Sequence, residues 1–238
     1  WDETTSAFVP IASKSPPWII LDMMTNSRFG GGLATARFDM VKLREFARHC
    51  YLYGLEFNGV FDVQMNLWDS VQNVLRVGRG QLVNVGTRYT VAIEGVGEPE
   101  MMFSVANMVK DSFKDNWLPT SERANEIEVT YFDKEDGNKQ KTVRVYDPAA
   151  ITAGRPQKSS SITLYGVDNI AQAYKEGLLQ LNLNRYILQT VAFSAPIEAI
   201  ACTVGELVYV QHDMPQWGYA GRCEAGSTLT TVKLDRPM

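Results

Sequence analysis

The sequence contains very little histidine, because only His49 and His212 occur in 238 residues. Histidine supplies much of the acid–base chemistry near neutral pH and is the commonest metal ligand in proteins. Neither histidine has a second ligand at the spacing of a metal motif, and His49 lies near the end of a predicted helix, where a positive charge is favourable. We therefore expect no metal site and no cofactor.

Cysteine is also scarce. Cys50, Cys202 and Cys223 are odd in number and far apart, so the sequence does not have the paired framework of a small disulfide-rich protein. We expect the three thiols to be reduced and buried, as in a protein assembled in a cytoplasm.

Long apolar runs are absent. No stretch reaches the roughly 18 apolar residues of a membrane span, and the acidic opening Trp1–Glu3 differs from the basic start of a signal peptide. The chain does not begin with Met, and it stops just after the strand-like run 227–234. We therefore expect a segment of a longer protein, without a membrane span.

The charge balance is slightly acidic, with 27 Asp and Glu against 23 Lys and Arg and a net charge of -4. Surfaces that bind DNA without sequence preference are usually basic, so the charge balance argues against such a surface. No sequence-specific nucleic-acid partner is expected either. A passage through which DNA moves without binding stays compatible with this balance. The hydrophobic fraction of 45% indicates a folded protein with a real core.

Motifs that would bind phosphate or activate a nucleophile are incomplete. The run Gly30–Gly32 lacks the Gly-Lys-Ser/Thr ending of a phosphate loop. Gly78-x-Gly80 has Val83 where a dinucleotide fingerprint needs glycine, and it follows a helix instead of a strand. No Gly-x-Ser-x-Gly elbow is present, and 159–161 is a serine run in a predicted loop. We predict no catalytic, cofactor-binding or metal-binding residue.

Two groups of residues leave other functions open. Glu126 and Glu128 share one face of a predicted strand and resemble the carboxylate pair of a cell-wall hydrolase, although alternation with apolar residues favours a solvated face. Trp68, Trp117 and Trp217 are compatible with a glycan- or receptor-binding module. Core packing or interface contact is the more common use of tryptophan.

Three helices are predicted. The first begins after Asp39, ends at Gly54, and places an apolar stripe inward: Leu43, Phe46, Ala47 and Cys50. The second covers 67–77, with Asn66 as its cap and with Gly78 and Gly80 ending it. The third follows Asp168 and is expected to turn inward Ile170, Ala171, Tyr174, Leu178 and Leu181. A glycine inside this third helix, Gly177, predicts close packing against another element.

Strands are predicted from alternation and turn residues at 57–64, 81–85, 88–94, 125–132, 142–146, 185–193, 206–211 and 227–234. Two pairs of these strands form hairpins, through Gly86-Thr87 and through Asp136–Asn138. The segment 147–161 is expected to be a long loop, and 18–21 fits either a buried strand or a short helix. These elements predict an α+β fold, with a mixed helix-and-antiparallel-sheet region over 1–195 and the start of a small β-barrel over 196–238.

Several segments resemble the central region of the lambda-like phage tail tip attachment, or host-specificity, proteins. The similar runs, in chain order, are 17–33, the first helix through His49-Cys50, 66–75, 125–131, 145–148 and 204–210. The resemblance covers nearly the whole chain and rests on the order of loose motifs. The segment 147–161 departs from the family pattern, because its length has no counterpart there.

The resemblance implies a structural role without catalysis or cofactor. Such proteins resemble the baseplate hub proteins of other tailed phages, in which trimers form a ring that closes the distal tail. It therefore implies a homotrimer of the full-length protein in the virion, at the distal tail. Assembly is implied in the bacterial cytoplasm, with the tail tube, tape measure and tip proteins as partners. Receptor recognition is then expected in other, C-terminal domains.

Overall fold

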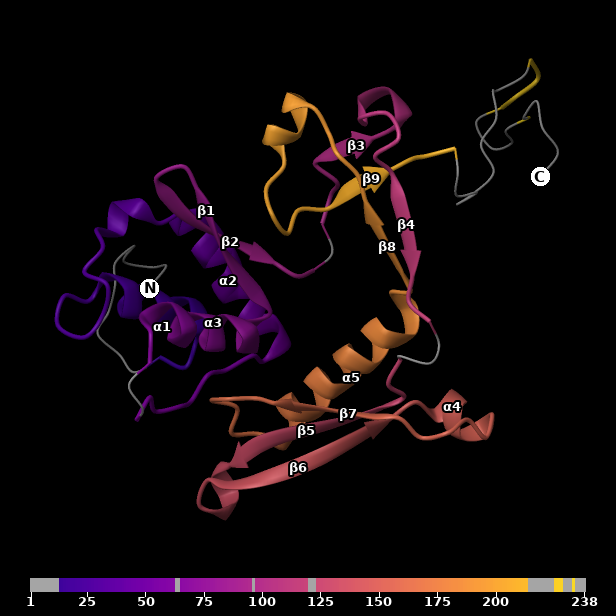
Figure 1. The fold of residues 1–238 in the computed structure, drawn as a ribbon. Helices are drawn as coiled ribbons and strands as arrows, with labels where there is room; N and C mark the ends of the chain where they lie inside the picture. The colour runs from indigo at the N-terminus through magenta and orange to yellow at the C-terminus, as the bar shows by residue number, and fades with distance from the viewer. Residues whose placement is uncertain are drawn as a thin grey trace.

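A computed structural model of the chain describes residues 13–62, 65–95, 97–119, 123–213, 225–228 and 233. The fold is α+β, as predicted, and has three parts (Figure 1). Helices α1–α3 and the hairpin β1–β2 form the first part. A three-stranded sheet with α5 packed on it forms the second. The third part consists of two ribbons, β3–β9 and β4–β8, which extend beyond the end of α5.

The first part begins with α1 (Pro16–Thr25), so 18–21 is helical. The segment has Pro at the first helical positions, where its missing N–H costs nothing, and it buries Ile20, Leu21 and Met24. The predicted first helix is α2 (Met40–Tyr53). Its boundaries are confirmed, because the Asp39 carboxylate accepts hydrogen bonds from two backbone N–H groups and Gly54 is left-handed at a φ of 64°.

The second predicted helix is α3 (Leu67–Gly78), with Asn66 as its cap, and β1 (Gly80–Val85) and β2 (Arg88–Ile93) follow as the predicted hairpin. The two glycines have a different role from the predicted one. The left-handed residue that ends α3 is Arg79, with a φ of 58°. Gly78 and Gly80 instead make room for the ring of Phe46, since an added Cβ would lie 2.5 Å and 2.6 Å from its Cζ.

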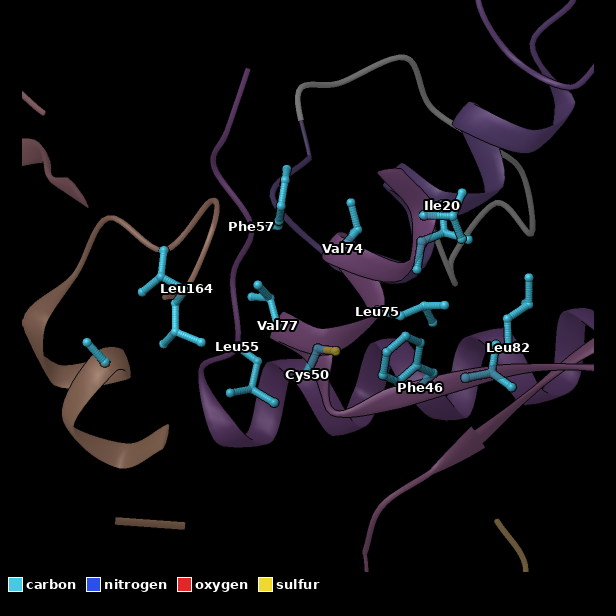
Figure 2. Close-up of a cluster of buried hydrophobic side chains, with 14 of the residues drawn as sticks. Ile20, Phe46, Cys50, Leu55, Phe57, Val74, Leu75, Val77, Leu82 and Leu164 are labelled. Carbon is cyan, nitrogen blue, oxygen red and sulfur yellow. The ribbon is translucent and has the colours of Figure 1, made fainter. Parts of the chain in front are cut away.

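The hydrophobic core is shared by the first two parts of the fold. In Figure 2, Phe46 and Cys50 lie between α2 and α3, beside Leu75 and Val77. Buried side chains of the three-stranded sheet belong to the same cluster, among them Val129. No described residue of the ribbons belongs to this cluster, so the stability of the ribbons has another source.

The strand predicted at 57–64 is wrong for 57–62, and residues 63 and 64 lie outside the described part. The Phe57 N–H donates to the Lys14 carbonyl at 2.8 Å, whereas the next N–H, of Asn58, donates to Gly166 at 2.7 Å. No further backbone pairing continues from these two bonds, so 57–62 belongs to none of the described sheets. The apolar side chains that produced the alternation pack as an aromatic cluster of Phe57, Phe61 and Tyr165.

The sheet of the second part has the order β6–β5–β7. The predicted hairpin is confirmed as β5 (Glu126–Asp133) and β6 (Lys139–Tyr146). The segment 147–161 is not one loop, because it contains α4 (Pro148–Thr152), capped by Asp147, and the start of β7 (Ser159–Thr163). β7 pairs parallel to β5, which makes the sheet mixed.

Helix α5 (Ile170–Tyr186) covers this sheet, but its buried face differs from the predicted one. Of the residues expected inward only Leu181 is buried, whereas the helix also buries Gln172, Ala173, Glu176 and Gly177. Polar contacts to the first part of the fold determine which face of α5 is buried. Gln172 exchanges two hydrogen bonds with the backbone of Glu56, and Glu176 binds Arg79.

Close packing at Gly177 is confirmed. A Cβ at this position would lie 2.8 Å from the Cγ2 atoms of Val129 and Val145. The glycine therefore lets α5 approach the sheet, at the helix-propensity cost of about 1 kcal/mol relative to alanine.

The ribbons pair segments that are far apart in sequence. β3 (Met101–Phe103) pairs parallel to β9 (Val208–Val210), and β4 (Lys114–Trp117) pairs antiparallel to β8 (Gln189–Ala192). The predicted strand 185–193 is too long, because its first residues belong to α5, and 206–211 is shortened to β9. The strand expected at 227–234 lies mostly outside the described residues.

The described strands form small open sheets and no closed barrel. The division at residue 195 stays a prediction, and β9, on its C-terminal side, pairs with β3 on its N-terminal side. No helix in the described part of the chain is long and apolar enough to cross a membrane.

Candidate assembly interface

The ribbons carry an unusual number of exposed apolar side chains, which we call the ribbon surface. Its members are Met102, Val105, Val109, Trp117, Leu118, Ile187, Ile197, Ile200, Val204, Leu207 and Tyr209. In the described ribbon segments, 97–119 and 187–213, Phe103 is the one hydrophobic side chain that is buried, and its ring centroid lies 5.1 Å from that of Phe193. Large contiguous apolar surfaces mark protein–protein contact sites.

The open sheet edges of the ribbons also indicate a protein–protein contact site. Each ribbon has two strands, and no other described strand pairs with their outer edges. A two-stranded ribbon is marginal in water, and parallel pairs such as β3–β9 normally occur with both faces covered. The geometry therefore fits a part of the chain that is completed by a partner.

A second apolar surface follows α5. Ile170, Tyr174 and Leu178 are exposed at a spacing of four residues and form one stripe on the helix. These are side chains that the sequence pattern placed in the core. Their exposure makes them candidates for contact with another molecule.

A groove of about 740 Å³ separates the first part of the fold from the ribbons. One wall consists of α2 and the hairpin, with Arg48 and Arg88, and the other includes the turn 203–207. The turn approaches the hairpin closely, since a Cβ on Gly205 would lie 2.5 Å from the Cβ of Ala92. The Thr203 hydrogen bonds hold the pKa of the Glu206 carboxyl below its usual value, and Lys42 adds to this.

The carboxylates Glu126 and Glu128 lie side by side on β5, facing Arg144. The prediction of a solvated face is wrong for Glu126, whose exposed fraction is 1%. Its Oε2 accepts hydrogen bonds from Gln157 and from Ser159, the latter at 2.8 Å. Arg144 binds Glu128 at 2.8 Å, but its Nε stays 3.8 Å from Oε1 of Glu126. This pair anchors the segment before β7 and gives the hydrolase interpretation no support.

We expect Glu126→Ala to lower the free energy of unfolding by about 2 kcal/mol, because the buried carboxylate loses the hydrogen bonds that it accepts from Gln157 and Ser159. Urea unfolding measures the change. Glu128→Ala is the matched control, and we expect a change below about 1 kcal/mol because that ion pair is more exposed. Equal effects of the two substitutions would contradict the anchoring role.

Both histidines pack against aromatic rings. Among the described residues no group of three or more His, Cys, Asp or Glu could hold a metal ion. His212 stacks on Phe113 at 3.9 Å, and His49 packs against Tyr53 at 4.7 Å. Burial, together with the charge of Arg79, lowers the pKa of His49 below its usual 6.5.

The lowered pKa of His49 predicts that the stability of the chain depends on pH. Because the pKa of His49 is lower in the folded chain, the unfolded chain binds the proton first as pH falls. We therefore expect stability to be complete above pH 6.5 and to decrease as pH falls below it. Urea unfolding at pH 7.5 and 5.5 measures the decrease, and His49→Gln should reduce it. A stability that rises toward pH 5.5 would contradict the assignment.

The other candidates from the sequence are dispersed. Cys50 is buried and Cys202 is half-buried, both as free thiols, and Cys223 lies outside the described residues. Trp68 is on α3 and Trp117 on β4, in separate parts of the fold (Figure 1), so they form no common platform for a glycan, and Trp217 is outside the described residues. The serine run at 159–161 forms the first part of strand β7.

Comparison with known proteins agrees with this picture of an assembly component. The profile of a family described as "Putative phage tail protein" matches residues 66–224. The chain is 23% identical over 225 residues to the tip attachment protein J of Escherichia phage SECphi27, a match that covers 88% of this chain and 18% of that protein. The chain thus spans less than a fifth of that relative's length.

Two solved structures are similar as well. One is from the virion of a native gene transfer agent particle, with a TM-score of 0.50 and 16% identity over 72% of this chain and 41% of that chain. The other is the tail protein from Neisseria meningitidis MC58, with a TM-score of 0.46 and 14% identity over 64% of this chain and 48% of that chain. Because the family profile covers well over half of the sequence, the chain belongs to this family of phage tail proteins.

Proposed function

We propose that the chain is part of the hub that closes the distal end of a phage tail and links it to the host-recognition parts. The observation that carries this proposal is the ribbon surface, with its exposed apolar side chains and open strand edges. Such a surface needs a covering partner, and in a tail component the available partners are copies of itself and neighbouring tail proteins. The similarity to a tip attachment protein supports the position at the tip.

The proposed assembly is a homotrimer around the tail axis, in contact with the tail tube, tape measure and tip proteins. Rings form from heterologous contacts whose rotation closes. The slight excess of acidic residues, 27 against 23 basic ones, would let DNA move through the ring without binding. A strongly basic lumen in the assembled ring would contradict this last point.

Sedimentation analysis of the chain tests the assembly. We expect a trimer for the unmodified chain and a monomer for Met102→Lys/Tyr209→Lys, because these neighbours in the β3–β9 register are exposed on one face. Ile151→Lys, at an exposed position of α4, is the matched control and should remain trimeric. A monomeric unmodified chain would contradict the homotrimer, and a trimeric double variant would exclude this face from the contact.

A further inference from the structure

We infer that the ribbons rock on the first part of the fold about the contact between Gly205 and Ala92, and that oppositely charged walls close the groove of about 740 Å³ at low ionic strength. We call this contact the pivot. The motion takes place within one chain, so it goes beyond the proposed hub and does not require assembly.

The ribbons are attached to the rest of the fold without a shared core. No described ribbon residue belongs to the buried hydrophobic cluster of the first two parts. One covalent connection is the end of α5, where Ile187 and Leu188 lead directly into β8. Parts of one chain move relative to each other unless a large hydrophobic interface joins them. The angle between the ribbons and the first part is therefore adjustable.

The pivot is a close contact between the turn 203–207 and the hairpin. A Cβ added to Gly205 would lie 2.5 Å from the Cβ of Ala92, so a small residue on each side allows the close approach. The pivot borders two grooves, one of about 740 Å³ and one of about 550 Å³, because Ala92 and Gly205 line both. Rocking about the pivot narrows one groove and widens the other.

The groove wall on the first part of the fold carries the cations. Lys42, Arg48 and Arg88 line this wall and are exposed. The two carboxylates on the same wall are already engaged, since Asp39 accepts backbone N–H groups of α2 and Glu45 binds Lys42 at 3.0 Å. Neither Arg48 nor Arg88 forms an ion pair with a described residue. This wall is therefore the basic side of the groove.

The opposite wall, on the ribbons, carries carboxylates. Glu98, Glu100 and Glu206 line it, and no described Lys or Arg of the ribbons does. The backbone N–H of Glu100 donates to the Leu207 carbonyl at 2.9 Å, which joins the segment of Glu100 to the turn of Glu206. No ion pair between described residues crosses the groove. Opposite charges thus face each other across the groove without direct contact.

Lys42 interacts electrostatically with the ribbon wall. Its hydrogen bond to Glu45 raises the pKa of Lys42, and the charge of Glu100 contributes to the rise. The Thr203 hydrogen bonds lower the pKa of the Glu206 carboxyl, and the charge of Lys42 contributes here as well. Salt screens such attraction, because the Debye length falls from about 30 Å at 0.01 M to about 3 Å at 1 M. Low ionic strength therefore favours the closed groove.

Pulsed electron paramagnetic resonance measures the width of the groove. Nitroxide labels are attached at Thr87→Cys on the hairpin turn and at Ile200→Cys on the ribbons, both at exposed positions, in a chain with Cys202→Ser and Cys223→Ser. Cys50 remains, because burial raises the pKa of its thiol to about 12 and keeps it unreactive. The labelled chain is diluted into an excess of unlabelled chain, so that each distance is measured within one chain.

We expect the ratio of the short-distance to the long-distance population to be about fivefold higher at 10 mM than at 1 M salt, as for about two exposed ion pairs that form on closure. The control pair, Thr87→Cys with Tyr51→Cys, has both labels on the first part of the fold. Its distance should be the same at both salt concentrations. A distance across the groove that does not change with salt would overturn the inference.

Charge substitutions in the labelled chain supply a second readout. Glu100→Lys should shift the chain to the long distance at low salt, and adding Lys42→Glu in the first turn of α2, where a carboxylate is favourable, should restore the short one. Glu198→Lys is the matched control, because Glu198 is an exposed ribbon carboxylate outside the groove. Equal shifts from Glu100→Lys and Glu198→Lys would refute closure by the groove charges. Neither result depends on whether the chain sediments as a trimer, so the hub proposal is tested separately.

Discussion

Replacing Arg79 by methionine is expected to lower the free energy of unfolding by about 3 to 5 kcal/mol, the usual cost of leaving a buried charge without its partner. Arg79 Nε lies 2.9 Å from Oε2 of Glu176, and their side chains are only 14% and 12% exposed. The pair joins the end of α3 to the middle of α5. Arg79 also adopts a left-handed backbone conformation, which is strained for a residue other than glycine. Its ion pair explains why arginine occupies this position.

Urea unfolding of a double-mutant cycle measures this effect. Arg79→Met and Glu176→Met should each be strongly destabilising, whereas the double variant should be close to the unmodified chain, because no unpaired charge remains. Arg76→Met is the matched control, an exposed arginine one turn earlier in α3, and should change stability by less than about 0.5 kcal/mol. Additive single effects would show that the pair does not join the two parts of the fold.

Replacing Gly78 by alanine is expected to destabilise the chain by about 3 kcal/mol, at the upper end of what overpacking a core costs. The added Cβ would lie 2.5 Å from Phe46 Cζ and 3.3 Å from Cys50 Sγ. Both of these neighbours are buried between α2 and α3 (Figure 2). The helix-propensity gain of about 1 kcal/mol from glycine to alanine is too small to offset this clash.

Thermal and urea unfolding compare this variant with Gly97→Ala. Gly97 has no atom within 4 Å of an added Cβ and no left-handed backbone, so its substitution should be nearly neutral. Phe46→Leu in the Gly78→Ala background should recover part of the loss, because it removes the ring atoms in contact. If Gly78→Ala matched Gly97→Ala, the proposed role of the glycine in ring packing would be wrong.

Local signals predicted the parts of the fold that depend on local contacts. The capping carboxylate of Asp39 and the left-handed Gly54 fix α2 within a few residues of sequence, and Asp136–Asn138 fixes the turn between β5 and β6. Gly177 was informative for the same reason, since a glycine inside a helix indicates close packing.

Contacts between distant segments could not be predicted in this way. The face of α5 follows its polar contacts with Glu56 and Arg79, which apolar periodicity does not report. The burial of Glu126 depends on Gln157, 31 residues later. Parallel pairing of β7 with β5 and of β9 with β3 likewise needs the tertiary structure.

The candidate interface could not be predicted from local sequence signals either. Ile197 and Ile200 were visible in the sequence as apolar residues, but only the pairing of the ribbons reveals that nothing in the described chain covers them. The phage tail family was predicted from the resemblance and not from chemistry, because a structural tail component has no catalytic motif to recognise.

Immunogold electron microscopy of intact particles tests the central claim most directly. An antibody raised against this chain would be bound to phage particles, and the position of the gold label along the tail would be recorded. The hub proposal predicts label clustered at the distal end of the tail. Label along fibres, or none on any particle, would contradict it and favour a separate binding module.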